Sequence, residues 1–281
     1  MSPLPTASPQ LPVIAFIGGG NMASAIIGGL IRQGHPADRM AVVEPWDEAR
    51  AALRKNFGIE ALPAPGPQLA QAGIVIWAVK PQTFKDAAAQ ACEHTRDALH
   101  LSVAAGIRTD SIAQWLGSDC IVRTMPNTPA LVGQGMSALY ARPGVSAEQR
   151  RSVEAIMATT GEFLWVESEK QLDAVTALSG SGPAYVFYFL EAMTRAGTAM
   201  GLTSAQAHQL AVGTFAGAAE LARRSDEPPE VLRQRVTSKG GTTYAALQSL
   251  EKDGVGASFE RAMHAAEQRA HELGNEFGAS A

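Results

Sequence analysis

From Val13 onward, short runs of aliphatic residues alternate with longer amphipathic stretches. This alternation predicts strand–helix units stacked around a parallel sheet. The predicted strands cover residues 13–17, 41–43, 74–79, 99–103 and 121–122. The predicted helices between them cover residues 23–32, 46–57, 81–91 and 109–115. The stretch 136–166 is expected to add further strands at the edge of the sheet.

Beyond residue 170 the strand signals stop, and helical periodicity continues to the end of the chain. The predicted helices there cover residues 173–178, 185–200, 204–223, 230–236, 243–252 and 258–277. The fold class is therefore predicted as α/β, with an N-terminal Rossmann-type, doubly wound parallel sheet followed by an all-α C-terminal domain. The predicted domains are a flexible tail rich in Pro and Ser over 1–12, the Rossmann-type domain over 13–170 and the helical domain over 171–281.

Composition narrows the possible functions. Hydrophobic residues make up 46% of the 281 residues and aromatic residues only 6%, which favours closely packed helices rich in alanine. A net charge of -4 disfavours sequence-independent nucleic-acid binding. Cys92 and Cys120 are too few for a disulfide framework and too far apart for a CxxC metal or redox motif, so we expect a reducing cytoplasm and no metal site. No apolar run approaches the ~18 residues of a membrane span.

A glycine-rich turn follows the first predicted strand and opens the first predicted helix. The segment Gly18-Gly19-Gly20-Asn21-Met22-Ala23 has the pattern G-x-G-x-x-A, which in this context is typical of dinucleotide binding. Gly18 would permit the tight turn, Gly20 would let the backbone approach a pyrophosphate, and Ala23 would let helix and strand pack closely. The helix start would supply N–H groups for the anion. The alternative is a glycine-rich turn that binds no ligand.

Glu44 ends the second predicted strand, a little over 20 residues after the glycines. An acidic side chain at this place can accept hydrogen bonds from an adenosine ribose, which favours NADH over NADPH. An exposed acid before a helix is also a common capping device. Arg50, about one turn into the next helix, could reach back toward a phosphate. Both NADPH and NADH therefore remain candidate cofactors.

Three further segments follow predicted strands and belong on the same edge of the sheet. Small residues around Ala105 would let a flat nicotinamide lie against the backbone, and Asn127 offers hydrogen bonds in a loop that prolines stiffen. Each segment could instead be an ordinary turn. The segments are Ala78-Val79-Lys80-Pro81, Ala104-Ala105-Gly106 and Met125-Pro126-Asn127-Thr128-Pro129.

Two loops of the helical half combine glycines with hydroxyl groups before a helix. Leu178-Ser179-Gly180-Ser181-Gly182-Pro183-Ala184-Tyr185 could be an interdomain hinge or a substrate-facing loop that uses Ser181. In Val236-Thr237-Ser238-Lys239-Gly240-Gly241-Thr242-Thr243-Tyr244, backbone N–H groups and threonine hydroxyls would suit a carboxylate. The threonines could instead only cap the helix. The order of Lys239 and the glycines excludes a P-loop.

Together these segments resemble the pyrroline-5-carboxylate reductase family over nearly the whole chain and in the expected order. The two loops of the helical half are much more specific than the glycine turn. The segments that carry the resemblance are Gly18–Ala23, Val79-Lys80-Pro81, Ala104-Ala105-Gly106, Met125–Ala130, Leu178–Tyr185 and Val236–Thr243.

The resemblance implies NAD(P)H-dependent reduction of 1-pyrroline-5-carboxylate to L-proline, the last step of proline biosynthesis. It also implies a homodimer formed through the helical domain, often assembled into larger rings. By motif, Gly18, Gly20, Asn21 and Met22 would contact the pyrophosphate. Val79, Lys80, Ala105 and Asn127 would line the nicotinamide side. Gly241, Thr242 and Thr243 would hold the substrate carboxylate and ring, and Asp226 corresponds loosely to an acidic position near the family's substrate site.

The sequence departs from the family at two places. Lys239 stands where the family usually has proline, which removes a backbone restraint and adds a cation near the expected anion site, unless the lysine only faces solvent. Glu44 stands where members that prefer NADPH commonly place a hydroxyl or basic residue.

None of the six histidines lies in a motif, so we expect catalysis by positioning, with Thr243 bonded to the ring nitrogen. Two other functions are possible from the pattern alone. A β-hydroxyacid dehydrogenase would need a lysine in the first long helix of the second domain, where residues 185–200 contain only Arg195 as a basic residue. A non-catalytic dinucleotide-binding regulator would have no use for the second glycine–threonine loop.

Overall fold

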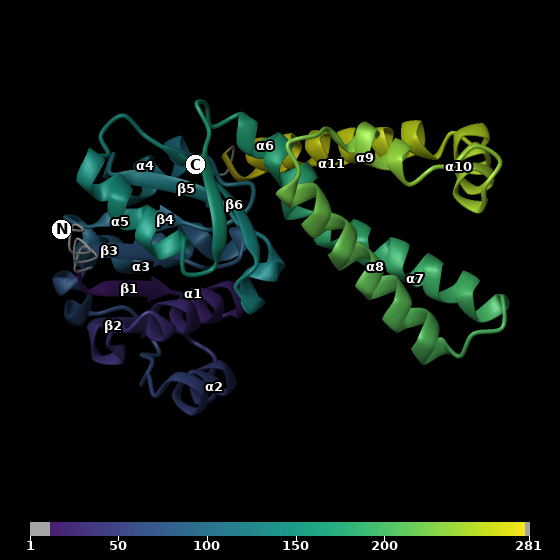
Figure 1. Cartoon of the computed structure of the whole chain (residues 1–281). Helices are drawn as coiled ribbons and strands as arrows, with labels where there is room; N and C mark the ends of the chain where they lie inside the picture. Colours follow the sequence, from purple (N-terminus) through teal and green to yellow (C-terminus); the bar gives the residue numbers. More distant parts are fainter. Residues whose placement is uncertain (1–11, 279–281) are drawn as a thin grey trace, which may run out of the picture. The chain divides into compact units, whose positions relative to one another are not determined.

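The computed structural model describes residues 12–278, which form two compact units (Figure 1). The first unit comprises the described residues up to Ser181 together with those from Ala266 onward, and the second is Gly182–Ala265. The end of the last helix therefore belongs to the first unit, although the sequence pattern assigns it to the helical half. Most of the predicted tail 1–12 lies outside the described residues.

A seven-stranded sheet forms the centre of the first unit, in the order β2-β1-β3-β4-β5-β6-β7. The five predicted strands and the two expected edge strands are confirmed. All neighbouring pairs run parallel except β5 and β6, which run antiparallel because the connection between them is too short for a helical crossover. The strands are β1 (Ile14–Ile17), β2 (Met40–Val43), β3 (Ile74–Trp77), β4 (Leu99–Ser102), β5 (Ile121–Met125), β6 (Gly135–Ala141) and β7 (Gly161–Trp165).

The strand order reverses at β1, which pairs with β2 on one side and β3 on the other. A single parallel bridge from Val43 to Leu62 extends the sheet beyond β2. Ligands of doubly wound sheets bind where the carboxyl ends of the strands meet such a reversal. The glycine turn after β1 and the segment after β3 both lie there.

Alternating side chains of β1 enter two separate cores, since successive strand residues point to opposite faces. Ile14 and Phe16 pack with residues of α1, α2 and α5, whereas Ala15 and Ile17 pack with residues of α3 and α4. Both faces of the sheet are thus covered by helices, which are α1 (Asn21–Arg32), α2 (Asp47–Phe57), α3 (Pro81–Thr95), α4 (Thr109–Leu116) and α5 (Ala147–Met157). Short 3-10 turns η1 (Ala37–Arg39), η2 (Pro67–Gln71) and η3 (Thr128–Val132) complete this part.

The chain beyond residue 170 is helical, as predicted. Its elements are α6 (Gln171–Val175), the π-helical turn η4 (Thr176–Gly180), α7 (Gly182–Ala199), α8 (Ser204–Arg224), α9 (Pro229–Arg235), α10 (Thr242–Lys252) and α11 (Val255–Gly278). Within residues 12–278, no helix combines the length and apolar character needed to cross a membrane.

Small residues let α7 and α8 pack closely, and the two helices lie side by side in Figure 1. A Cβ atom on Gly197 would lie 2.9 Å from the Cβ atom of Ala207, so no larger side chain fits at residue 197 without moving the helices. Farther along, Phe259 of α11 contacts Tyr185 and Phe189 of α7, with ring centroids 5.4 and 5.8 Å apart. The second unit thus gains an aromatic contact between its first and last helices.

Candidate functional site

The turn after β1 leaves the start of α1 open to a ligand. Gly18 adopts φ +97°, and a Cβ atom there would lie 2.5 Å from the Ala78 carbonyl oxygen, so only glycine fits. Gly20 is the N-cap of α1 and no side chain caps this helix. Gly20 and Asn21 are exposed, Met22 is half-buried, and space is open where a Cβ atom of Gly20 would lie. Unpaired N–H groups at such a helix start fit a pyrophosphate.

Glu44 lies beside this turn and is almost completely buried, with 6% of its surface exposed. Its Oε2 atom accepts a hydrogen bond from the Gly19 N–H at 2.8 Å, and its Oε1 atom accepts one from the Trp46 N–H at 3.0 Å. The carboxylate thus connects the end of β2 to the glycine turn and bonds the backbone at the start of α2. Glu44 is therefore not the exposed helix cap that the sequence also allows, since the N-cap of α2 is Trp46 and no side chain caps this helix. Its function as a ribose acceptor stays a prediction.

The other cofactor residues predicted in the first unit lie at carboxyl ends of strands. Val79 and Lys80 follow β3, Ala105 follows β4 and Asn127 follows β5. Val79, Ala105 and Asn127 are half-buried, and Lys80 is exposed at the N-cap of α3. Because β3, β4 and β5 are consecutive parallel neighbours, these residues share one edge of the sheet.

Asn127 is more engaged in the fold than the sequence predicts. Its Oδ1 atom accepts a hydrogen bond from the Met136 N–H at 2.9 Å, and its Nδ2 atom donates one to the Ser179 carbonyl at 3.1 Å. The side chain therefore fixes the loop after β5 to β6 and to η4. One amide N–H is left to face a ligand.

Ser181 follows the π-helical turn η4, a local geometry that is frequent at functional sites. Its N–H donates to the Thr176 carbonyl at 2.8 Å, and the residue is half-buried. The structure thus places Ser181 at a helix irregularity immediately before α7.

The remaining predicted substrate residues belong to the second unit. Gly241 is the N-cap of α10, and no side chain caps this helix. A Cβ atom on Gly241 would lie 2.6 Å from Ser238 Oγ, so the turn before the helix is tight. Thr242 and Thr243 occupy the first two helical positions, and both residues are exposed. The start of α10 therefore brings backbone N–H groups and two hydroxyls together, although the Gly241 N–H itself donates to the Ser238 carbonyl at 3.0 Å.

Two other residues of the second unit bear on the substrate loop. Lys239 precedes Gly240, which adopts φ +74°, and the lysine is exposed. Asp226 is exposed in the connection between α8 and α9. The geometry of the chain thus leaves both side chains at the surface.

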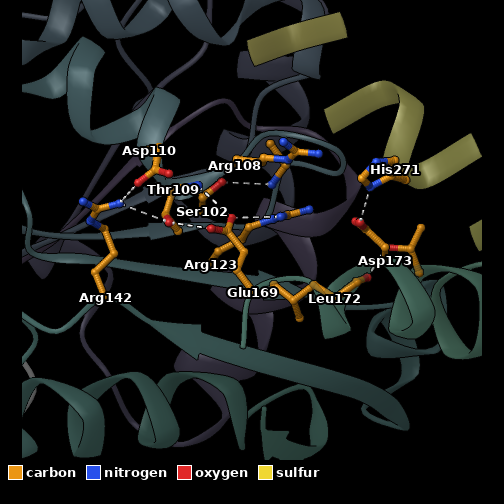
Figure 2. A network of polar contacts seen from close by, with 12 residues as sticks. Ser102, Arg108, Thr109, Asp110, Arg123, Arg142, Glu169, Leu172, Asp173 and His271 are labelled. Atoms are coloured by element: carbon orange, nitrogen blue, oxygen red, sulfur yellow. Dashed lines mark hydrogen bonds and ion pairs between the residues drawn. The ribbon is translucent and has the colours of Figure 1, made fainter. Parts of the chain in front are cut away.

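Sequence reasoning missed a polar network at the amino end of α4, drawn in Figure 2. The Glu169 carboxylate accepts hydrogen bonds from the Thr109 N–H and hydroxyl, both at 2.7 Å, and from Arg123 Nη1 at 2.9 Å. Nearby, His271 of α11 lies 3.5 Å from the Asp173 carboxylate of α6. These residues are far apart in the chain and belong to no short motif, so the sequence carries no local signal for them.

Two family models match the chain. One is described as pyrroline-5-carboxylate reductase dimerisation and covers residues 169–273. The other is described as NADP oxidoreductase, coenzyme F420-dependent, and covers residues 13–106.

Curated relatives match nearly the whole chain. It is 45% identical over 273 residues to the pyrroline-5-carboxylate reductase of Pseudomonas aeruginosa, with 95% of this chain and 98% of the relative covered. The Haemophilus influenzae pyrroline-5-carboxylate reductase is 40% identical over 270 residues, covering 94% and 98%.

Solved structures of pyrroline-5-carboxylate reductases also match the chain. A pyrroline-5-carboxylate reductase from Coxiella burnetii matches with a TM-score of 0.84 and 38% identity, covering 93% of this chain and 98% of that one. The Plasmodium falciparum pyrroline carboxylate reductase, solved with NADP bound, matches with a TM-score of 0.84 and 28% identity, covering 94% and 99%. On these identities and this coverage, the chain belongs to the pyrroline-5-carboxylate reductase family.

Proposed function

We propose that this chain reduces 1-pyrroline-5-carboxylate to L-proline with hydride from NADPH or NADH, the last step of proline biosynthesis. The observation that carries the proposal is the uncapped start of α1, which follows a glycine-only turn at the reversal of the sheet. In a member of this family, that geometry is the expected dinucleotide site.

The first turn of α1 would hold the cofactor pyrophosphate. The N–H groups of Gly20, Asn21 and Met22 would bind the anion, which the helix dipole also favours. Gly18 makes the tight turn that points these N–H groups toward the ligand. Glu44 would accept hydrogen bonds from the ribose. The chain thus holds a doubly charged group largely by backbone, which suits a protein with a net charge of -4.

The carboxyl ends of β3, β4 and β5 would line the nicotinamide. Val79 and Ala105 offer apolar and small surfaces, Asn127 offers its remaining amide N–H, and Lys80 offers a cation. A bound reduced nicotinamide supplies the hydride that the reaction needs. The contribution of these residues is to hold and orient the nicotinamide ring.

The start of α10 would hold the substrate. The N–H group at Thr242 would bind the substrate carboxylate, and the Thr243 hydroxyl would bond to the ring nitrogen. Gly241 would shape the turn beside the carboxylate, because its own N–H donates to the Ser238 carbonyl at 3.0 Å. Ser181 and Asp226 are proposed as further substrate contacts. The reaction adds a hydride to the imine carbon, and the imine nitrogen also needs a proton. An imine that binds in its protonated form already carries that proton. No strong acid on the enzyme is then required.

Replacing Thr243 tests its proposed catalytic role. Thr243→Ala should lower kcat by about 10-fold or more, while the Kd for the reduced cofactor changes less than about twofold, because the hydroxyl acts only on the ring nitrogen. Steady-state kinetics and a fluorescence titration of the cofactor measure the two quantities. Thr243→Ser keeps the hydroxyl and should retain most of the activity. Equal losses in kcat and in cofactor binding would contradict the catalytic role.

The reaction itself is tested by the absorbance of NADH and of NADPH on addition of 1-pyrroline-5-carboxylate. A parallel assay with a 3-hydroxy acid and oxidised cofactor tests β-hydroxyacid dehydrogenase activity. Helix α7 contains no lysine, which disfavours that activity. If the imine oxidises neither reduced cofactor, the proposed function is wrong.

The proposal extends to assembly and location. Exposed apolar side chains on α7 and α8, among them Phe187, Tyr188 and Leu210, support a homodimer through the helical domain of residues 171–281. A larger ring of dimers is proposed from the family resemblance. A cytoplasmic location is proposed as well, and the two free cysteines, Cys92 and Cys120, support it.

A further inference from the structure

We propose that the end of β2 makes this chain selective for NADH over NADPH, with the Glu44 carboxylate accepting hydrogen bonds from the two hydroxyls of the adenosine ribose. The inference rests on the proposed function and deepens it by naming the cofactor. It follows from the contacts of Glu44, Arg50 and Trp46.

Glu44 is fixed in place before any ligand binds. Its two carboxylate oxygens accept hydrogen bonds from the N–H groups of Gly19 and Trp46, and the side chain is almost fully buried. A carboxylate can accept about four hydrogen bonds, so about two positions remain for a vicinal diol. A ribose 2′-phosphate replaces one of those hydroxyl donors with a charged acceptor, and it would meet a like charge.

Gly19 brings this carboxylate close to the site. A Cβ atom on Gly19 would lie 2.6 Å from Leu53 Cδ1 and 3.2 Å from Glu44 Cβ. A larger residue at this position would crowd the side chains of Leu53 and Glu44. The acidic group therefore lies directly against the loop that would hold the pyrophosphate, at the distance in the chain where Rossmann domains recognise the ribose.

The Arg50 guanidinium is not available to pair with a ribose 2′-phosphate. Its Nη1 atom donates to the carbonyls of Glu44 and Pro45, at 2.9 and 2.7 Å, and its Nη2 atom is paired with Asp47. The guanidinium is thus held by backbone carbonyls and a carboxylate. Asp47, the partner of Arg50 Nη2, adds a second carboxylate in the first turn of α2, which makes this place unfavourable for a ribose 2′-phosphate.

Trp46 supplies a surface for the adenine. The residue is 75% exposed, and its backbone N–H group donates to the Glu44 carboxylate, so its ring is accessible to a base bound near that carboxylate. An aromatic face at this place can stack on a base without any charge requirement. Stacking would add affinity for both cofactors alike, and the selectivity would come from Glu44.

The test is a fluorescence titration of the full-length protein with NADH and with NADPH, followed through energy transfer from tryptophan to the reduced nicotinamide. We expect the Kd for NADH to be at least about 10-fold lower than that for NADPH. Competition with 5′-AMP and with adenosine 2′,5′-bisphosphate should show the same order, which confines the effect to the adenosine end. A Kd for NADPH equal to or lower than that for NADH would overturn the inference and leave the proposed function intact. If neither cofactor binds, the proposed function fails as well.

Two variants locate the selectivity. Glu44→Gln should reduce the ratio of the two Kd values at least fivefold, since the charge is lost and the size is kept. Asp47→Asn should tighten NADPH binding at least twofold, because it frees one side of the Arg50 guanidinium. Glu48→Gln is the matched control: it removes an exposed acid from the same helix turn and should leave the ratio within about twofold. A ratio that is unchanged in both Glu44→Gln and Asp47→Asn would assign the selectivity elsewhere and overturn the inference.

Discussion

The protonation state of His100 is set by the burial of its side chain. It lies in the centre of β4 with no exposed surface, and its Nδ1 atom accepts a hydrogen bond from Trp77 Nε1 at 3.2 Å. Since the indole can only donate, Nε2 must carry the proton of the neutral ring. Burial lowers the pKa of His100 to about 4 from its ordinary value of 6.5. The folded protein therefore holds this ring neutral.

This shift predicts a loss of stability in acid. In the unfolded chain His100 takes up a proton below about pH 6.5, whereas in the folded chain it does so only near pH 4. The free energy of unfolding should therefore be highest above pH 6.5 and fall as the pH drops toward 4, by about 2 kcal/mol between pH 7 and pH 5. His100→Gln keeps an acceptor for Trp77 and should remove that part of the pH dependence. Urea unfolding of both proteins at equal chain concentration measures it, and parallel pH profiles would contradict the assignment.

At the scale of elements, α4, β5 and the start of α6 are joined by one carboxylate (Figure 2). Glu169 bonds both to the first residue of α4, Thr109, and to Arg123 of β5, whose side chain is only 4% exposed. It also places a negative charge at the positive end of α4. Arg142 joins Asp110 and Asp119 in the same region, but both of those carboxylates are exposed.

The two ion pairs should therefore contribute different amounts to the free energy of unfolding. Glu169→Ala leaves the buried Arg123 charge without its partner and should cost about 3–5 kcal/mol of unfolding free energy. Asp110→Ala removes an exposed partner of Arg142 and should cost less than about 1 kcal/mol. Chemical denaturation of the two variants at the same pH compares them. Equal losses would show that the burial of Arg123 does not decide the energy.

At the scale of the whole molecule, the second unit exposes more apolar surface than a single chain needs. Phe187 and Tyr188 on α7 and Leu221 on α8 are each more than half exposed. Alanine and glycine keep these helices close, as at Gly197, so the large side chains are left on the outer faces. A dimerisation domain accounts for this arrangement, because a second copy would cover those faces.

Charge placed on this surface should weaken the dimer. Phe187→Glu is expected to shift the protein toward monomer by at least about 10-fold in the dimer dissociation constant, because a carboxylate in an apolar interface would be desolvated without a partner. Multi-angle light scattering over a dilution series measures the shift. Val132→Glu, at a 75% exposed position of the first unit, is the control and should leave the mass unchanged. A Phe187→Glu protein with the dimer mass at every dilution would exclude this face from the interface.

The sequence by itself determined the strands, the helices and the two glycine-led helix starts, because their signals are local: aliphatic runs, helical periodicity and glycines at fixed spacing. Only the tertiary structure decided that β6 runs antiparallel to β5, that Asn127 bonds to Ser179, and that Glu44 accepts a hydrogen bond from the Gly19 N–H. Those facts depend on contacts between distant parts of the chain. Pairing energies of this kind leave no periodic pattern in the sequence, so they emerge only when the sheet is assembled.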